Sequence, residues 1–284
     1  MPKFGLLAEH LSCLGILTQD NCHQPAPLSL EALMRAHTGD YVQRFIRGQL
    51  TVQEEKDIGL PWSDWLVERT LRAVSGTMLT AHLALEHGLA CHLAGGTHHA
   101  FPDHGSGFCI FNDLAVAAID LIHTGRAKKV MIIDCDVHQG DGTTAFFNDS
   151  SHVIPVSFHC EENYPLEKQL SGINIPIPKH AEDEEYLAIL AQHVPALLAE
   201  YQPDFVFYDA GVDVHKDDRL GYVRLTDAGI LARDRYVIEH ALNSGASVAC
   251  VIGGGYDHDH SVVAARHSLV HQAAHTIWLE RFAS

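Results

Sequence analysis

The chain has 284 residues, of which 46% are hydrophobic, so it can bury a large core without disulfides to hold it together. Its formal net charge of -17, with no local basic patch, would repel phosphates and predicts no direct binding to nucleic acid. The sequence shows neither a signal peptide nor an apolar run long enough to span a membrane, and its seven cysteines lack paired spacing. These features predict a cytoplasmic protein.

Taken in chain order, helical periodicity and short apolar runs alternate. Helices are predicted for five segments: Ser63 to His87, Phe111 to His123, Asp183 to Tyr201, Thr226 to Asn243 and His260 to Phe282. Buried strands are predicted for four segments: Lys129 to Asp134, Val153 to Phe158, Asp204 to Tyr208 and Ala246 to Ile252. The alternation predicts one α/β domain over residues 1–284, with a mostly parallel central sheet and helices on both faces.

Polar clusters follow three of the predicted strands. Asp134 to Asp141 follows the first, Ala210 to Asp213 the third, and Gly253 to Tyr256 the fourth. Because sites in parallel sheets gather beyond the carboxyl ends of the strands, we expect these clusters to meet at one rim.

The pattern Asp134-x-Asp136-x-His138-x-x-Asp141 has the residue types that bind a divalent metal. Alternate residues of an extended strand point the same way, and Asp213 could complete a set of two carboxylates and one imidazole. Such a set leaves a coordination position open, as in catalytic zinc sites. Taken alone, a run of this kind is more often a hydrogen-bonded loop anchor, and the other clusters favour the metal.

Two further features indicate acid–base and oxyanion chemistry. His98 and His99 are adjacent in a glycine-rich loop, where imidazoles held by the carboxylates of Asp134 and Asp141 could accept and return a proton. Tyr256 follows three glycines and could donate its hydroxyl to an oxyanion. A histidine pair in a loop is usually just part of a polar surface. The interpretation therefore depends on finding the pair together with the Asp–His cluster and Tyr256.

These motifs occur in the order seen in histone deacetylases, and the chain resembles that family over nearly its whole length. The resemblance is closest to class IV and its bacterial relatives, as three segments suggest: Leu60 to Ser63, Gly105 to Cys109 and Asp217 to Gly221. It implies an arginase/deacetylase-like fold with one zinc ion per chain, held by Asp136, His138 and Asp213. It also implies His98 and His99 as the acid–base pair, braced by Asp134 and Asp141, and Tyr256 as the group that polarises the scissile carbonyl.

The resemblance extends to a second ion and to the substrate. A potassium ion is implied near five residues: Asp134, Asp136, His138, Ser157 and Phe158. A narrow tunnel for an acylated lysine is implied by Gly107, Phe108, Tyr164 and Gly255. Leu220 stands where similar polyamine deacetylases carry a glutamate, so removal of acetyl or longer acyl groups from N-ε-acyl-lysine peptides is favoured over acetylpolyamine deacetylation.

Two other functions compete with this interpretation. An arginase-like hydrolase with two manganese ions would need more carboxylates. In this sequence Gly140 and His215 occupy the positions where an arginase-like site has aspartates. A non-catalytic module that binds acylated lysine would usually have lost a catalytic residue, and none is missing here. The sequence does not determine the oligomeric state.

Two segments carry weaker expectations. Relatives have usually completed a first strand and a substrate-side loop before this point, so an edge strand and part of the tunnel mouth would be absent if residues are missing upstream of Met1. His267, His271 and His275 recur every four residues on a predicted helix. Histidines at this spacing share a helix face and could form an exposed metal site, but we expect a polar helix face, because no carboxylate is spaced to join them.

Overall fold

The computed structural model describes residues 2–281, and every named strand in it belongs to one sheet. The strands lie in the order β1-β6-β5-β2-β3-β4, and each neighbouring pair is parallel. Their bounds are β1 Leu89–Cys91, β2 Val130–Asp134, β3 Val153–Cys160, β4 Ile173–Ile177, β5 Phe205–Asp209 and β6 Ser247–Val251. The predicted α/β fold is confirmed, with a sheet that is wholly parallel.

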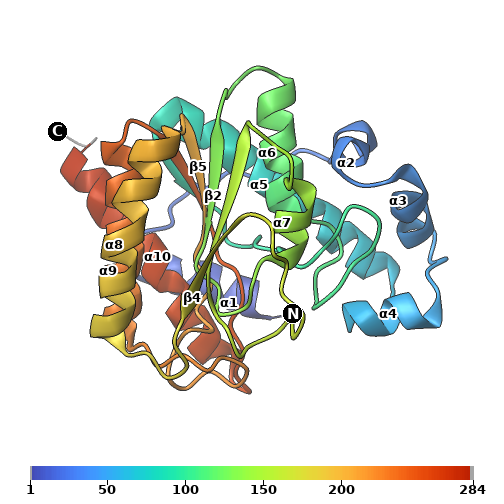
Figure 1. Cartoon of the computed structure of the whole chain (residues 1–284). Helices are drawn as coiled ribbons and strands as arrows, with labels where there is room; N and C mark the ends of the chain where they lie inside the picture. The colour runs from blue at the N-terminus through green and yellow to red at the C-terminus, as the bar shows by residue number, and fades with distance from the viewer. Residues whose placement is uncertain (1, 282–284) are drawn as a thin grey trace.

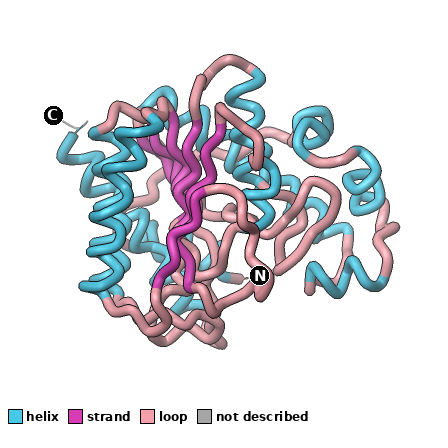
Figure 2. The backbone as a smooth tube through the Cα atoms, viewed as in Figure 1, coloured by secondary structure: helices cyan, strands magenta, loops and turns pink. Residues whose placement is uncertain are grey.

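Helices cover both faces of the sheet (Figures 1 and 2). Their bounds are α1 Lys3–Cys13, α2 Leu30–Ala36, α3 Gly39–Ile46, α4 Val52–Ile58, α5 Asp64–His87, α6 Asp113–His123, α7 Asp141–Phe146, α8 Asp183–Tyr201, α9 Asp227–Asn243 and α10 His260–Arg281. In Figure 1, α8, α9 and α10 lie on the left of the sheet and α5, α6 and α7 on the right, with α2, α3 and α4 outermost. This arrangement follows from parallel pairing, which requires a long crossover between neighbouring strands.

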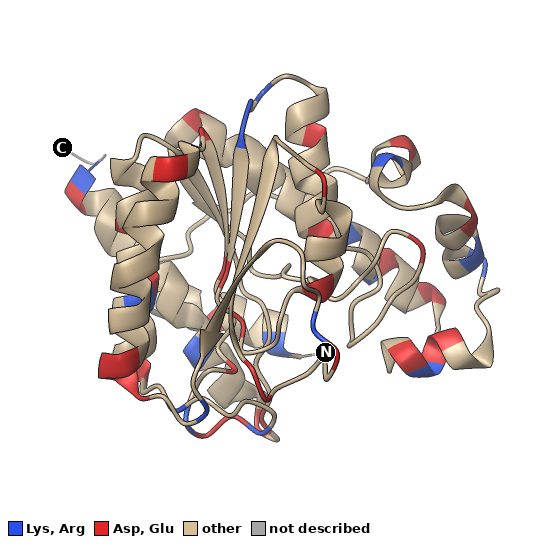
Figure 3. Cartoon of the chain, viewed as in Figure 1, with Lys and Arg blue, Asp and Glu red and all other residues tan. Residues whose placement is uncertain are grey.

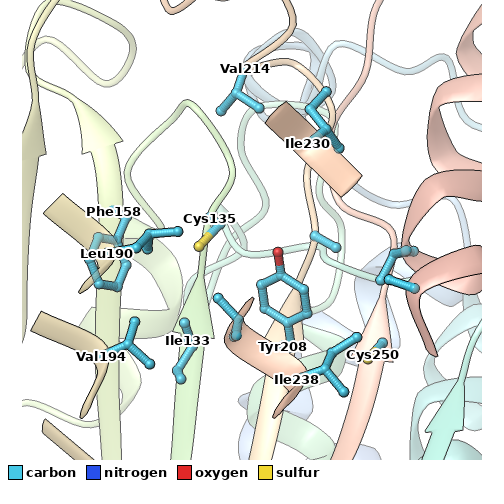
Figure 4. Packing of buried hydrophobic residues seen from close by; sticks show 14 of the residues in the cluster. Ile133, Cys135, Phe158, Leu190, Val194, Tyr208, Val214, Ile230, Ile238 and Cys250 are labelled. Carbon is cyan, nitrogen blue, oxygen red and sulfur yellow. The ribbon is translucent and has the colours of Figure 1, made fainter. Parts of the chain in front are cut away.

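The core has one apolar layer on each side of the sheet. On one side, Ile133 and Tyr208 from the strands pack with Leu190 of α8 and Ile238 of α9 (Figure 4). On the other side, strand residues such as Phe207 pack against α5 and α6. Every residue of β2, β3 and β5 is buried, which explains why these strands read as continuous apolar runs.

The four predicted strands are present, with ends within two residues of the predicted ones. The sequence interpretation missed the two edge strands. β1 has three residues, and β4 contains Pro176 and is partly exposed, so neither gives a continuous apolar signal. The five predicted helices are also present, although the predicted end at Phe282 lies outside the described residues.

The short helices α2, α3 and α4 were not predicted, although α4 carries a readable start signal. Thr51 accepts a hydrogen bond from the Glu54 backbone N–H, and the Glu54 carboxylate accepts one from the Thr51 backbone N–H. This capping box, followed by Gly59 in the left-handed conformation (φ 74°), defines both ends of the helix. The three helices form a small apolar cluster of their own with α5.

The expected polar face of α10 is wrong for two of its three histidines. His267 and His271 are only 1% and 5% exposed, because α10 packs against both α1 and α9. His275 is half-buried. No helix within residues 2–281 combines the length and the apolar character needed to cross a bilayer.

His37, buried next to the start of α6, makes the fold sensitive to acid. Its buried Nε2 accepts a hydrogen bond from the Asn112 backbone N–H at 3.0 Å, and burial lowers its pKa to about 4. Between the ordinary pKa of 6.5 and about 4, the unfolded chain binds a proton that the folded chain does not. Stability due to this residue is therefore lost as the pH falls through that window, by about 3 kcal/mol when complete.

We predict that His37→Gln, which keeps a hydrogen-bond acceptor but cannot titrate, is less destabilised by acid than the wild type. The free energy of unfolding of both proteins can be measured with urea at pH 7.5 and at pH 4.5. Between the two pH values, the wild type should lose about 2 to 3 kcal/mol more of this free energy than the variant does. His23→Gln, at an exposed position, is the control and should follow the wild type. A gap that does not change with pH would show that His37 does not titrate in this way.

Candidate active site

Four loops meet at the carboxyl end of the sheet. The loop 92–99 follows β1, 135–141 follows β2, 210–213 follows β5, and 252–256 follows β6. Backbone hydrogen bonds join them directly: the Val212 N–H donates to the Gly254 carbonyl, and the Gly253 N–H donates to the Gly95 carbonyl. The convergence expected from the sequence is thus present, and these loops lie in the lower centre of Figure 2.

Asp136, His138 and Asp213 form a buried cluster with the composition of a metal site. The Nδ1 atom of His138 lies 3.0 Å from Asp136 Oδ1 and 3.0 Å from Asp213 Oδ2. The three ligand atoms lie within 4.8 Å of one another, and all three residues are buried. The structure therefore brings the three predicted ligands together.

The electrostatics of this cluster fit a bound cation. A single imidazole N–H cannot satisfy two carboxylates at once, and two buried carboxylates at short range repel each other. Burial and then the charge of Asp136 raise the pKa of Asp213 to about 7. A divalent cation would relieve this repulsion, and two oxygens with one nitrogen match the donors of an open zinc site.

Glycines let the neighbouring backbone approach these carboxylates. The Gly254 N–H donates to Asp136 Oδ2 at 2.7 Å. A Cβ atom at Gly254 would lie 2.4 Å from Asp213 Oδ2 and 2.6 Å from Asp136 Oδ2, closer than real contacts allow. The glycine run after β6 is therefore required by the packing of the loop over the ligands.

Each of the adjacent histidines is paired with its own carboxylate. His98 Nδ1 lies 2.7 Å from Asp134 Oδ2, and His99 Nδ1 lies 2.6 Å from Asp141 Oδ1. The two rings are 4.2 Å apart between centroids, and all four side chains are buried. This geometry leaves the Nε2 atom of His99 free to face a substrate, while the carboxylate fixes its ring.

The surroundings give the two histidines different charges. Burial would lower the pKa of His98, but Asp134 and Asp136 outweigh it and raise that pKa well above its ordinary value. Burial and the neighbouring positive charge of His98 lower the pKa of His99 to about 4. These opposite shifts favour a charged His98 beside a neutral His99 at neutral pH, a division that the sequence left open.

Tyr256 stands beside the metal-site cluster. Its ring centroid lies 6.1 Å from that of His138, and its backbone N–H donates to Asp218 Oδ2 at 2.7 Å. Burial, followed by the charges of Asp136 and Asp213, raises the pKa of the phenol well above its usual value. The hydroxyl stays protonated at neutral pH and can donate a hydrogen bond.

Aromatic side chains flank the approach to His99. The Tyr164 ring lies 5.0 Å from the His99 ring, and its hydroxyl is 2.7 Å from Ser106 Oγ. Phe108 packs 6.1 Å from Tyr256 and remains 45% exposed. A Cβ atom at Gly107, where φ is +53°, would lie 2.7 Å from the His99 ring, so only glycine fits there.

The other two predicted substrate residues lie differently. Gly255 borders the site, and a Cβ atom there would lie 2.6 Å from Val212 Cγ2. Leu220 is half-exposed, and its carbonyl accepts a hydrogen bond from Asn163 Nδ2, next to Tyr164. Leu220 is not among the described residues that line the cavity at the site.

The residues expected around potassium lie at the end of β2, in the loop after it and on the neighbouring strand β3. Asp134 at the end of β2 pairs in register with Ser157 of β3, which Phe158 follows. The Gly140 N–H donates to Ser157 Oγ at 3.4 Å.

Asp209, which the sequence interpretation missed, lies directly behind His98. It pairs in register with Asp134, is fully buried, and neither of its oxygens has a hydrogen-bond partner in the described structure. Its Oδ2 lies 4.0 Å from His98 Nδ1, and His98, Asp134 and Asp209 form a second group with metal-ligand spacing. The sequence does carry a signal for Asp209: it is a polar residue at the end of an apolar run, but the predicted strand stops one residue before it, at Tyr208.

Arg233, a second missed residue, supports the metal-site loops from α9. Its Nη1 donates to the Cys135 carbonyl at 3.1 Å and to the Gly211 carbonyl at 2.7 Å. Asp234 neutralises the guanidinium at 2.7 Å, and both side chains are fully buried. No local motif marks Arg233, since the two carbonyl groups to which it donates lie 98 and 22 residues away in the sequence.

A third support holds the histidine loop. The Asp113 carboxylate accepts hydrogen bonds from the backbone N–H groups of Gly96 and Thr97 and from the Thr77 hydroxyl. Asp113 is fully buried at the start of α6. The loop that carries His98 and His99 is thereby fixed to the helical layer.

Comparison with known proteins agrees with this geometry. Residues 3–272 match the family model of the histone deacetylase domain, and the chain belongs to that family. An uncharacterized protein of Picosynechococcus sp. is 49% identical over 278 residues, covering 98% of this chain and 93% of that protein. Histone deacetylase 2 of Arabidopsis thaliana is 28% identical over 264 residues, covering 89% and 68%. The crystal structure of a histone deacetylase homologue from Aquifex aeolicus superposes with a TM-score of 0.80 at 25% identity, covering 97% and 76%.

We predict that Gly254→Ala weakens binding of a divalent metal by at least about tenfold, because the added methyl group would push Asp136 and Asp213 apart. Zinc affinity can be measured by competition with a chromophoric chelator, with circular dichroism as the check on folding. Gly5→Ala, a helical position with open space around it, is the matched control. Unchanged zinc affinity in a folded Gly254→Ala protein would remove Asp136 and Asp213 as a joint metal site.

Proposed function

We propose that this chain is a zinc-dependent deacylase that hydrolyses N-ε-acyl-lysine amides in proteins or peptides. The observation that carries the proposal is the convergence of a buried metal-ligand set, Asp136, His138 and Asp213, with two His–Asp pairs and Tyr256. Family membership supports it, since histone deacetylase relatives are generally amide hydrolases. The flanking aromatics Phe108 and Tyr164 suit the methylene stem of lysine.

The side chains divide the reaction among them. Zinc, when bound to Asp136, His138 and Asp213, would act as a Lewis acid that activates water and polarises the amide carbonyl. His99, neutral at neutral pH and oriented by Asp141, accepts the proton of the attacking water and returns it to the leaving amine. His98, held charged by Asp134, stabilises the negative charge that develops nearby.

Tyr256 completes this arrangement on the carbonyl side. Its protonated hydroxyl donates a hydrogen bond to the carbonyl oxygen as negative charge builds on it. The second predicted ion, potassium, would lie behind the zinc ligands near Asp134 and Ser157, where it would neutralise buried carboxylate charge. We assign it no part in bond cleavage.

The proposal predicts hydrolysis of acyl-lysine peptides that is lost with the metal. Acetyl-, decanoyl- and myristoyl-lysine peptides and acetylated polyamines, tested at matched concentrations, should show turnover of at least one peptide, and a chelator should abolish it. Adding back zinc should restore it. If only acetylated polyamines are hydrolysed, the substrate class is acylpolyamine and not acyl-lysine. If the zinc-loaded protein binds acyl-lysine peptides without hydrolysing them, the chain is a non-catalytic module.

Metal analysis of the active protein separates one ion from two. We expect one zinc per chain, whereas two manganese ions per chain with guanidine hydrolysis would support an arginase-like enzyme. Within residues 2–281, the buried group of His98, Asp134 and Asp209 is the second cluster with metal-ligand spacing and the candidate position for a second manganese ion.

We predict that Tyr256→Phe lowers kcat by about a hundredfold or more, because one hydrogen bond to the developing oxyanion is lost. Zinc content should stay the same, since Tyr256 is not among the proposed ligands. Tyr201→Phe, at the last residue of α8 and outside the proposed site, is a control that should keep full activity. Full turnover by a folded Tyr256→Phe protein would exclude the tyrosine from the reaction.

A further inference from the structure

A cavity of about 300 Å³ connects the catalytic residues with two helices that the proposed reaction does not use. Its lining includes His98, His99 and Tyr256 and also Lys3 and Phe4 of α1 and Arg69 of α5. Apolar residues of α5, among them Val74, form part of the wall between these groups. The cavity therefore offers space beside the catalytic residues, and its border carries three cationic side chains, Lys3, Arg69 and Arg219, and the carboxylate of Asp257.

Two of these cations are grouped around one aromatic ring. Lys3 Nζ lies 5.5 Å from the centroid of the Phe4 ring, and the Arg69 guanidinium lies 5.1 Å from it. Contacts of this kind hold cations in place but do not neutralise them. The packing of α1 against α10 fixes Lys3 further, since its Nζ is 3.4 Å from His267 Nε2.

Neither cation has an acidic partner in residues 2–281. No carboxylate oxygen of this part of the chain lies within 4.0 Å of Lys3 or Arg69, and the buried Nε of Arg69 has no hydrogen-bond partner. Six other arginines do have a carboxylate within that distance: Arg35, Arg44, Arg72, Arg233, Arg235 and Arg266. No lysine and no further arginine of residues 2–281 has such a partner, so what distinguishes Lys3 and Arg69 is their place together at a cavity beside the catalytic residues. Acidic side chains, 36 against 19 basic ones, are spread over the helices and loops of the fold (Figure 3).

Placing the charges of Lys3 and Arg69 close together in a partly buried position costs free energy. A bound anion would offset that cost by attracting both cations. Burial and then the charge of Arg69 lower the pKa of Lys3 to about 8, and burial lowers the pKa of Arg69 as well. Asp213 and Asp136 attract the lysine at longer range, but both are committed to the proposed metal. The site therefore has the charge, donors and space for a carboxylate.

We propose that this cavity accepts acyl groups that end in a carboxylate, with Lys3 and Arg69 binding the distal carboxylate. The preferred substrates would then be lysine amides of short dicarboxylic acids, such as succinyl-lysine and glutaryl-lysine. This inference rests on the proposed deacylase function and names its acyl class. Hydrolysis breaks only the amide C–N bond: the water oxygen joins the acyl carbon, the amine leaves with a proton, and the distal carboxylate is unchanged.

The test compares two acyl groups of the same shape and different charge on one peptide. Succinyl-lysine carries the distal carboxylate, and 4-methylpentanoyl-lysine replaces its two oxygens by methyl groups. The ratio of their kcat/KM values does not depend on the fraction of folded protein, so partial misfolding of a variant does not affect it. Lys3→Met and Arg69→Gln remove one cation each, and acetyl-lysine measures the basal reaction.

We expect the wild type to favour the succinyl peptide, and each variant to lower the ratio by about tenfold or more, as loss of a hydrogen bond to a charged group implies. Lys3→Arg keeps the charge and should retain most of the preference. Lys56→Met and Arg72→Gln, at exposed positions, are the matched controls and should keep the ratio of the wild type.

Three results would overturn the inference. A wild-type ratio at or below one would show that the distal carboxylate is not recognised. If Lys3→Met and Arg69→Gln lower kcat/KM equally for both substrates, the two cations act on the carboxylate product that every amide hydrolysis forms, and not on the distal carboxylate. Acetyl turnover with no succinyl turnover would refute this inference alone, whereas no turnover of any acyl peptide by the zinc-loaded protein would refute the proposed deacylase function itself.

Discussion

Two buried carboxylates that face one imidazole nitrogen are the constraint on which this structure depends. Asp136 and Asp213 come from the loops after β2 and β5 and meet at His138 Nδ1, each at 3.0 Å. Their repulsion is tolerable only with a cation or a proton between them, so the surrounding loops must supply donors and leave room. Glycine at 211 and 254 provides the room, and the N–H groups of Val137 and Gly254 provide the donors.

The interior of the fold was predictable because its physical signal is local. The central strands β2, β3 and β5 are covered on both faces, and this burial requires the uninterrupted apolar runs that the sequence displays. At the sheet edges the requirement weakens, and β1 and β4 carry no comparable pattern. The polar clusters were equally readable, since polar groups directly after buried strands must lie at the carboxyl rim of a parallel sheet.

The rest of the site depends on contacts between distant residues, which no local pattern records. Arg233 lies 98 residues from the carbonyl of Cys135 to which it donates. The different charges of His98 and His99 arise from burial and from neighbouring carboxylates, although the two residues are adjacent in sequence. The histidines of α10 were read as a polar face because their spacing is helical, and only the packing of α1 onto that helix reveals that two of them are buried.

The contacts of Arg233 also bear on how the protein would acquire its ion. Its guanidinium ties the backbone before Asp136 to the backbone before Asp213, and it does so from a helix that contributes no ligand. The spacing of the two loops is thus set by the polypeptide, unlike that of small zinc modules, which unfold without their metal. Binding or loss of an ion at this site would consequently not require the two loops to refold.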